Sequence, residues 1–516
     1  MEKQEENGLG VAYAPGNGPD ESENGVWGAC SWQSGPDHAK HEHFLKAVLH
    51  LLVEEAVFRA TDRHSKVVEW MEPDQLRKRL DLTLREEGVT QDDLLKQLKD
   101  VVKYSVKTGH PYFINQLFSS LDVYGLVGQW ITDALNPSVY TYEVAPVFTL
   151  MEFQVLATMA DHVGYKEHDG LFSPGGSMSN LYGMLLARYS HFPDVKKRGT
   201  NGLGRLVVFT SVDAHYSLAK SAMTLGLGSD NLILINVNHD GRMDVNHLKE
   251  SISKAREEGA TPFMVCATAG TTVLGAYDPV DAVADVCQDE DLWLHVDAAW
   301  GGGALLSPRY KHKLKGIHRA DSVTWNPHKL LAAPQQCSVF LTRHVGLLKE
   351  CNSASAAYLF QKDKFYDTSY DTGDKHLQCG RRADVLKFWT MWKAKGTKGL
   401  EKHIERLFEM SEAFVKQIRD REGFVLLMEP QCTNVCFWYE PPSLRGQRCH
   451  PNYHTRLHAV APLIKERMVK TGSMMVTYQP LREKPNFFRL VLQNSQVNHD
   501  DIHYFVRQIE ALGSDL

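Results

Sequence analysis

Short apolar runs alternate with longer stretches of helical spacing through the middle of the chain, between about residues 111 and 386. Each run has the length and the β-branched or aromatic content of a buried strand. The runs cover residues 206–209, 232–235, 263–267, 292–296, 322–325 and 339–342. This alternation predicts an α/β fold with a largely parallel sheet, in which ligand-binding groups lie at the strand ends.

The two flanks of this region have different patterns. Residues 1–38 are rich in Gly, Pro, Glu, Asn and Ser without periodicity, which predicts a disordered tail. Helical spacing from Leu45 to Val57 and a charged helical run over residues 73–102 predict a helical N-terminal segment. After about residue 395 a helical stretch precedes three β-like runs, which predict a small α+β domain and cover residues 435–439, 473–478 and 487–492. We therefore divide the chain into a tail (1–38), a helical segment (39–110), a large α/β domain (111–390) and a small C-terminal domain (391–516).

The composition is typical of a soluble globular protein, because 23% of the 516 residues are charged and 43% are apolar. A net charge of −6 gives no basic surface for nucleic acid or an anionic membrane, so we expect a small-molecule ligand. No stretch reaches the roughly 18 to 20 uncharged apolar residues that cross a bilayer. The nine cysteines are scattered and the first residues lack the pattern of a secretion signal, so we expect a cytoplasmic protein.

Lys329 and Asp297 stand at the ends of predicted strands, in SVTWNPHKLLAAP and LWLHVDAAWGGG. A lysine removed from water has a lowered pKa, so its neutral amine can form a Schiff base with a carbonyl; a surface lysine in a loop is the alternative. A carboxylate at the end of a buried strand costs several kcal/mol unless it meets a cation, such as a protonated ring nitrogen. For Asp297, a helix N-cap or a structural hydrogen bond is the alternative.

Three further positions add to this pattern. Gly175 and Gly176, in GLFSPGGSMSN, open a helical stretch whose free N–H groups suit a phosphate, with Ser177 close by; a plain turn is the alternative. His215 follows a predicted strand, where its imidazole can lie against an aromatic ring or belong to the core. Arg489 lies inside the apolar run NFFRLVL, and a buried arginine needs an anion. Together these positions supply what pyridoxal 5′-phosphate (PLP) and an acidic substrate require.

From about residue 40 to its end, the chain resembles the group II PLP-dependent decarboxylases, and within them the glutamate, cysteine sulfinate and aspartate 1-decarboxylases. The motifs that carry this resemblance are HPYFINQLFSSLD, YTYEVAPVF, FSPGGSMSN, ATAGTTVLGAYDP, WLHVDAAWGGG, SVTWNPHK, SYDTGDK, LKFWTMWKAKG, TNVCFWY, SLRG and NFFR. The resemblance implies the fold type I architecture of aspartate aminotransferase. It also implies a homodimer with active sites at the subunit interface, in which the helical segment 39–110 takes part in dimerisation.

The resemblance also assigns cofactor roles to individual positions. Lys329 would form the Schiff base with PLP, Asp297 would hold the ring nitrogen, and His215 would stack on the ring. The remaining cofactor contacts that it implies are Gly176, Ser177 and Asn326 at the phosphate, Thr268, and Ala299 on the ring face opposite His215.

On the substrate side, the resemblance implies that Arg489 binds the side-chain acid, with Gln116 nearby. Tyr358, in SAAYLFQKDKFYD, matches the tyrosine of a mobile catalytic loop that returns a proton to the substrate Cα. By this resemblance, glutamate decarboxylases have a small residue at the position of Phe118 and an asparagine at the position of Ser138. A bulky Phe118 shortens the pocket and favours an acid with a single CH₂ before the side-chain acid.

Gln335, in AAPQQCS, is similar to the insect aspartate 1-decarboxylases, whereas vertebrate-type cysteine sulfinate and glutamate decarboxylases have leucine there. An amide can hydrogen-bond a planar carboxylate, which leucine cannot. We therefore expect decarboxylation of L-aspartate to β-alanine and CO₂, with conversion of cysteine sulfinate to hypotaurine as a side activity. The alternatives are cysteine sulfinate as the main substrate, or glutamate with γ-aminobutyrate as the product.

Other classes of function fit the sequence less well. We expect no metal site, because His41 with His43 and Cys432 with Cys436 each lack a complete ligand set. A catalytically inactive homologue that serves as a scaffold would not need to keep Lys329 and the other positions described above. An aminotransferase shares the fold and the Schiff base, and CO₂ release without a keto-acid acceptor separates the two enzyme classes.

Overall fold

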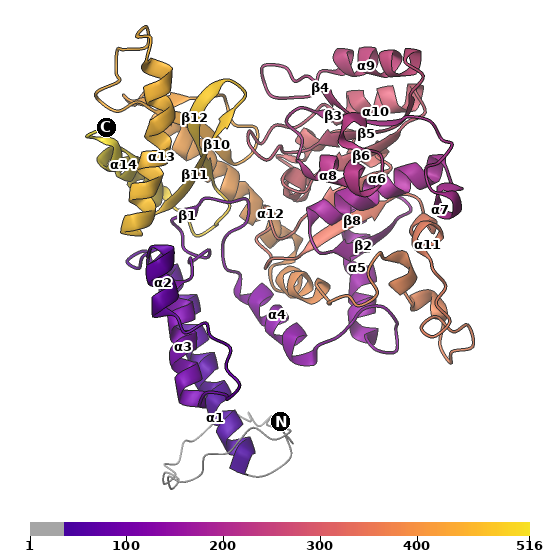
Figure 1. Cartoon of the computed structure of the whole chain (residues 1–516), viewed down its shortest axis with the longest axis horizontal. Coiled ribbons are helices and arrows are strands. Elements are labelled where there is room, and N and C mark those ends of the chain that lie inside the picture. The colour runs from indigo at the N-terminus through magenta and orange to yellow at the C-terminus, as the bar shows by residue number, and fades with distance from the viewer. Residues whose placement is uncertain (1–35) are drawn as a thin grey trace, which may run out of the picture.

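The computed structural model describes residues 36–516. The predicted tail lies outside these residues except for its last positions, 36–38, which already belong to helix α1 (Pro36–Leu51). The chain forms two sheets with their helices and an N-terminal arm of helices that projects from them (Figure 1).

The larger sheet has seven strands in the order β2-β8-β7-β6-β5-β3-β4. Neighbouring strands are parallel except at β8, which is antiparallel to both β2 and β7. The strands are β2 (Asp169–Ser173), β3 (Leu206–Ser211), β4 (Leu232–Ile235), β5 (Thr261–Thr268), β6 (Trp293–Asp297), β7 (Ser322–Trp325) and β8 (Ser338–Thr342). This confirms the predicted α/β class with a mostly parallel sheet, and it adds β2, which the apolar pattern did not reveal.

Both faces of this sheet are buried, because successive residues of a strand point to opposite sides. Along β5, Met264 and Cys266 pack in the core that includes helices α6 and α8, whereas Val265 and Ala267 pack in the core that includes α9 and α10. The helices that follow β1 up to the end of the sheet are α4 (Val123–Leu135), α5 (Pro146–Val163), α6 (Gly176–His191), α7 (Val195–Arg198), α8 (Ser217–Thr224), α9 (Val245–Glu257), α10 (Val280–Asp289) and α11 (Leu347–Asn352). Short 3₁₀ turns join these elements: η2 (Ser229–Asn231), η3 (Gly301–Leu306), η4 (Lys311–Leu314), η5 (Ile317–Arg319), η6 (Thr368–Tyr370) and η7 (Gly373–Lys375).

The smaller sheet has five strands in the order β1-β11-β12-β10-β9. Its strands are β1 (Phe113–Ile114), β9 (Phe424–Leu426), β10 (Asn434–Tyr439), β11 (Met475–Leu481) and β12 (Lys484–Val491). The three predicted β-like runs correspond to β10, β11 and β12, while β1 comes from far upstream and pairs in parallel with β11. Helices α13 (Tyr453–Thr471) and α14 (His499–Gly513) pack with this sheet in a second core.

Helix α12 (Val385–Ile418) connects the two sheets and bends at Gly396, whose φ of +64° is open to glycine but strained for other residues. It contacts α4 and α5 on one side and α14 on the other. The predicted boundary between residues 390 and 391 lies inside this helix, and the division into domains stays a prediction.

The N-terminal arm consists of α1, the π-helix η1 (Leu52–Arg59), α2 (Pro73–Arg79) and α3 (Gln91–Tyr104). The predicted helical run over residues 73–102 is wrong in its middle, because residues 80–90 separate α2 from α3. Leu80, Leu82 and Leu84 alternate with polar residues in this stretch, a period that favours extended chain. Thr90 is the N-cap of helix α3, and its side chain accepts a hydrogen bond from the N–H of Asp93.

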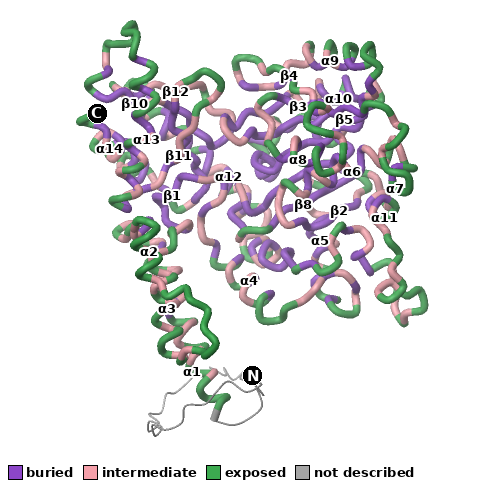
Figure 2. The backbone as a smooth tube through the Cα atoms, in the orientation of Figure 1, coloured by how far each residue is buried: buried purple, intermediate pink, exposed green. Residues whose placement is uncertain are grey.

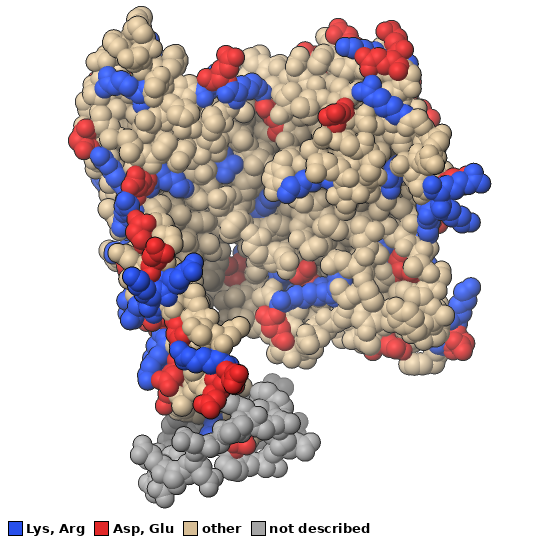
Figure 3. All heavy atoms as spheres, in the orientation of Figure 1, with Lys and Arg blue, Asp and Glu red and all other residues tan. Residues whose placement is uncertain are grey.

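The arm buries little of its own surface. Helices η1, α2 and α3 contain no buried residue, and Figure 2 shows them mostly exposed or intermediate. Lys and Arg side chains are interspersed with Asp and Glu on the face drawn in Figure 3. Within residues 36–516, no helix combines the length and the apolar character needed to cross a bilayer.

Candidate active site

A cavity of about 220 Å³ lies at the carboxyl ends of parallel strands of the larger sheet. Sites at this edge of a parallel sheet collect side chains from several strand ends. All of the predicted cofactor residues line it, and these are Gly176, Ser177, His215, Thr268, Asp297, Ala299, Asn326 and Lys329. The structure therefore brings together residues that lie far apart in the sequence.

Lys329 follows β7 and lines this cavity. Burial lowers the pKa of its amine; the carboxylate of Asp297 opposes this shift, and the positive charge of Arg489 adds to it. A residue from another part of the chain holds the backbone of Lys329. The side-chain amide of the buried Gln493 donates one hydrogen bond to the carbonyl of Lys329 and another to the carbonyl of Ser119. Sequence reasoning missed Gln493, since nothing in the pattern shows that this amide meets Lys329.

Asp297 is the last residue of β6, and both of its oxygens accept hydrogen bonds. Oδ1 accepts from the N–H of Ala299 at 3.0 Å, and Oδ2 accepts from the side-chain amide of Asn180 at 2.8 Å. The side-chain oxygen Oδ1 of Asn180 lies 3.1 Å from Nε2 of His295. These bonds hold the carboxylate in one orientation in which it faces the cavity, where it can meet a cation such as a protonated ring nitrogen.

His215 lies between β3 and α8, with Nδ1 at 2.8 Å from the hydroxyl of Ser217. Burial lowers the pKa of His215, and the nearby carboxylate of Asp297 opposes that shift only in part. The imidazole is therefore held mainly neutral, the state in which a ring can pack against another aromatic ring without a desolvated charge.

The start of α6 has the features of a phosphate site. Gly175 has a φ of +136°, and a Cβ on Gly176 would lie 2.8 Å from the side-chain nitrogen of Asn326 and 3.3 Å from Cβ of Ala299. Only a residue without a side chain fits at Gly176, so the backbone stays open to a ligand. The hydroxyl of Thr268 is buried without a hydrogen-bond partner in the described chain, which leaves a polar atom for a ligand to satisfy.

Arg489 lies on β12 and is 6% exposed. Its guanidinium donates at 2.8 Å to the carbonyl of Thr272, a residue that lines the same cavity, while its Nε has no partner. Among residues 36–516 it forms no ion pair with a carboxylate, and burial lowers its pKa. A buried guanidinium without an acidic partner is a group whose charge an anion can compensate.

Gln116 and Phe118 follow β1 on the segment that approaches Arg489. The backbone carbonyl of Asn115 lies 3.5 Å from Nη2 of Arg489, and the ring of Phe118 lies 6.3 Å from that of Phe113. Both predicted residues are partly buried. They are therefore on the side of the site where the predicted substrate acid would lie.

Six predicted residues do not line the cavity in the single described chain: Arg489, Gln116 and Phe118, which are described above, and Ser138, Gln335 and Tyr358. The hydroxyl of Ser138 accepts a hydrogen bond from the N–H of Arg381 at 3.1 Å. Gln335 is exposed, and its carbonyl accepts a hydrogen bond from Lys387 at 2.7 Å. Tyr358 is 78% exposed. None of these three residues lines the cavity that contains Lys329.

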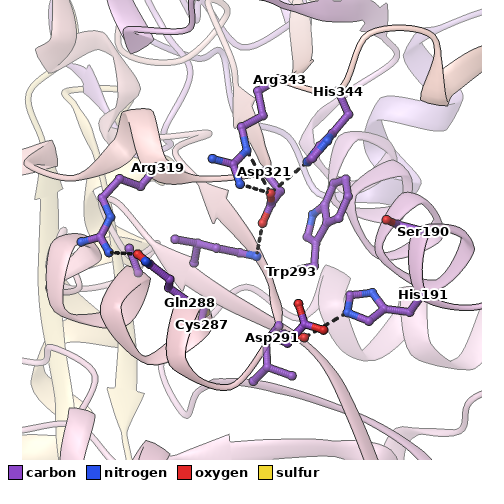
Figure 4. A pocket seen from close by; sticks show the side chains of 13 residues that line it. Ser190, His191, Cys287, Gln288, Asp291, Trp293, Arg319, Asp321, Arg343 and His344 are labelled. Atoms are coloured by element: carbon purple, nitrogen blue, oxygen red, sulfur yellow. Dashed lines mark hydrogen bonds and ion pairs between the residues drawn. The ribbon is translucent and has the colours of Figure 1, made fainter.

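A larger cavity of about 740 Å³ lies near the amino ends of β6 and β7, at the opposite edge of the sheet (Figure 4). Its charges are compensated within the protein: Asp321 pairs with Arg343 at 2.7 Å and with His344 at 2.9 Å, and Arg319 pairs with Asp285 at 2.7 Å. Because these groups need no ligand, the smaller cavity is the candidate site. Within residues 36–516, no group of three or more His, Cys, Asp or Glu side chains lies together as metal ligands would.

Comparison with known proteins gives consistent results. The family model described as the pyridoxal-dependent decarboxylase conserved domain matches residues 73–440. Acidic amino acid decarboxylase GADL1 from Bos taurus is 53% identical over 476 residues, which cover 92% of this chain and 91% of that protein. Human cysteine sulfinic acid decarboxylase is 53% identical over 476 residues, covering 92% and 97% of the two chains. The crystal structure of mouse CSAD superposes with a TM-score of 0.92 at 51% identity, and the match covers 93% of this chain and 100% of that one.

Proposed function

The chain belongs to the pyridoxal-dependent decarboxylase family and is a PLP enzyme of its acidic amino acid branch, and we propose that its main reaction converts L-aspartate to β-alanine and CO₂. The main evidence for an acidic substrate is Arg489. Its guanidinium is buried without a counter-ion and bonds Thr272, which lines the cavity that contains Lys329. Such a cation lowers the free energy of a bound substrate that has a second acid group.

The residues of the cavity fit PLP. Gly176, Ser177 and Asn326 would hold its phosphate, Asp297 its ring nitrogen, and Lys329 its aldehyde carbon. Bound PLP supplies a protonated ring that accepts the electron pair released when the bond from Cα to the carboxylate breaks.

The protein's own groups prepare this step. The lowered pKa of Lys329 leaves a nucleophilic amine. The bonds from Asn180 and Ala299 fix the orientation of the Asp297 carboxylate, which would meet the ring nitrogen. Arg489 would bind the side-chain acid and so fix the direction of the α-carboxylate that is lost. Tyr358 would return a proton to Cα.

The choice of substrate rests on a few residues. Phe118 supports an acid with one CH₂, which both aspartate and cysteine sulfinate have, and glutamate has one more. On the resemblance described above, Ser138 also supports the cysteine sulfinate and aspartate branch, and Gln335 supports aspartate. Cysteine sulfinate is the second candidate as main substrate, because relatives with about half of their residues identical are cysteine sulfinic acid decarboxylases.

A competition experiment tests this order. Cofactor-loaded protein is incubated with equimolar L-aspartate, cysteine sulfinate and L-glutamate, and the amines are measured by mass spectrometry. Mostly β-alanine supports the proposal, mostly hypotaurine supports the second candidate, and mostly γ-aminobutyrate contradicts the role given to Phe118. Without any CO₂ release the proposed function fails.

We also propose a homodimer in which each chain contributes to the partner's site. Helix α4 carries exposed apolar side chains at four-residue spacing, at Val123, Val127, Ile131 and Leu135. Gln335 lies beside this helix, because Lys387 bonds both the carbonyl of Gln335 and the side chain of Gln129 on α4. A second copy packed on α4 would thus meet Gln335, which its own chain leaves exposed.

Mixing two inactive variants tests this arrangement. If Tyr358 acts in the partner's site, a mixed dimer of Lys329→Ala and Tyr358→Phe chains has one site with both native residues. Mixed dimers purified from a co-expression through two different tags should then have about half of the activity of the native protein, because one of their two sites is complete. Activity no higher than that of either variant alone would contradict the shared site. A cytoplasmic location, expected from the scattered cysteines, stays a prediction.

A further inference from the structure

A second, partly buried cation, Lys465, is linked to Arg489 through Asn115. Lys465 is on α13, which packs against β11 and β12, and its Nζ donates to the carbonyl of Val476 at 2.7 Å and to the side-chain oxygen of Asn115. Asn115 is 6% exposed, and its backbone carbonyl faces Arg489. One asparagine therefore links the two cations.

No carboxylate among the described residues pairs with either cation. On β12 the charged neighbour of Lys465 is Arg489, on β11 the contact is a backbone carbonyl, and on β10 Cys436 lies opposite Arg489. On α14, Asp501 pairs with Arg63 and Glu510 with Arg421, and the third acid, Asp500, is exposed. Two cations thus share a buried region that lacks an anion.

This arrangement makes the charge of Lys465 sensitive to what binds at Arg489. Burial lowers the pKa of Lys465 to about 8, and the positive charge of Arg489 contributes to the lowering. An anion at Arg489 would offset that repulsion and raise the pKa again. By linkage, a protonated Lys465 favours anion binding, and the benefit is lost as pH rises through about 8.

We propose that Lys465 is a positioning residue of the substrate-acid subsite, which strengthens the binding of the side-chain acid at Arg489 through its charge and through Asn115. The inference rests on the proposed function, because it takes Arg489 as the residue that binds this acid. Lys465 does not touch the substrate in this scheme. Its charge raises the electrostatic potential at Arg489, and its bond to Asn115 positions the backbone carbonyl that faces Arg489.

The test is steady-state kinetics of the holoenzyme with L-aspartate and with cysteine sulfinate between pH 6.5 and 9. Lys465→Met keeps the length of the side chain and removes its charge, and we expect KM to rise about tenfold at pH 7 with kcat within about twofold. In the native protein KM should rise as pH increases through 8, and this rise should be smaller in the variant. The substrate amine titrates equally in both proteins, so the difference between them isolates Lys465.

Two further variants complete the experiment. Lys470→Met, on the exposed face of the same helix where Lys470 pairs with Glu466, should leave KM and its pH dependence unchanged. Lys465→Arg keeps a charge that does not titrate below pH 9, so its KM should stay low across the range.

The outcomes separate two failures. A native KM profile in Lys465→Met, with an unfolding temperature like that of the native protein, overturns the inference. If Lys465→Met does not fold, the inference is overturned by Lys465→Arg when that variant keeps the native rise of KM above pH 8. A native enzyme that releases no CO₂ from either acid overturns the proposed function instead.

Discussion

Replacing Arg489 by methionine removes the buried cation that bonds the cavity residue Thr272, and it keeps most of the side-chain volume. In the native chain the guanidinium is 6% exposed and contacts carbonyl oxygens of Thr272 and Asn115 rather than a carboxylate. Its charge is therefore available to a ligand. We expect Arg489→Met to lose the binding of the substrate's side-chain acid while the cofactor site remains intact.

The magnitude follows from the bonds that are lost. A guanidinium bound to an acid group through two charge-assisted hydrogen bonds at about 1.5 to 3 kcal/mol each contributes about 3 to 6 kcal/mol. At about 1.4 kcal/mol per factor of ten, kcat/KM should fall about 100-fold to 10,000-fold. Stability should change little, because the variant loses the bond to Thr272 but no longer buries an uncompensated charge.

The assay measures CO₂ release with L-aspartate and cysteine sulfinate, beside cofactor absorbance and thermal unfolding. The matched control is Lys484→Met, an exposed cation at the start of the same strand, which should behave like the native protein. A variant at Arg489 with native kcat/KM for both acids would refute the reasoning. So would an equal loss of bound cofactor, since the effect would then lie in the fold of the site and not in substrate binding.

Three other changes test different parts of the site. Gly176→Ala places a Cβ 2.8 Å from the side-chain nitrogen of Asn326, so PLP affinity measured by absorbance titration should fall about tenfold or more. Asn180→Leu leaves one oxygen of the buried Asp297 without its donor, which should cost about 1 to 3 kcal/mol of unfolding free energy in a urea titration of the apoprotein. Gln335→Leu should lower the preference for aspartate over cysteine sulfinate about fivefold, the value of one hydrogen bond, in a direct competition assay.

Each of these has an outcome that contradicts it. Native PLP affinity in Gly176→Ala would mean that the chain near Asn326 moves aside at no cost. An unchanged urea midpoint in Asn180→Leu would mean that water replaces the amide. An unchanged product ratio in Gln335→Leu would remove the main support for aspartate as the preferred substrate.

The sequence was informative where a residue type conflicts with its surroundings. Lys329, Asp297 and Arg489 are charged residues in or beside apolar runs. Because the carboxyl ends of parallel strands meet at one edge, the proximity of Lys329 and Asp297 follows from the α/β pattern, whereas that of Arg489, on the smaller sheet, does not. The strands from β3 to β8 were predictable because a strand that is buried on both faces is a continuous apolar run.

Other parts could not be predicted because their cause is not local. Asn180 is a polar residue inside a helix, a position that usually faces water, and only the packing of α6 against β6 turns it toward Asp297. Lys465 looks like any other lysine of a surface helix, yet its Nζ bonds the side chain of Asn115 and the carbonyl of Val476 on β11. Strand β1 has two residues, too few to give a period, and exists because β11 provides an edge.

The pairing of β1 with β11 also joins an early and a late part of the chain, which has a consequence for its synthesis. Strands β2 to β8 have all left the ribosome before β11 and β12 are made, so the larger sheet and most PLP contacts can form on the growing chain. Asn115 can meet Arg489 only after β12 has been made, because long-range pairing must wait for its partner strand. A chain that stops early keeps Lys329 and Asp297 but lacks Arg489. Truncated products could therefore take up cofactor while being unable to bind the acidic substrate.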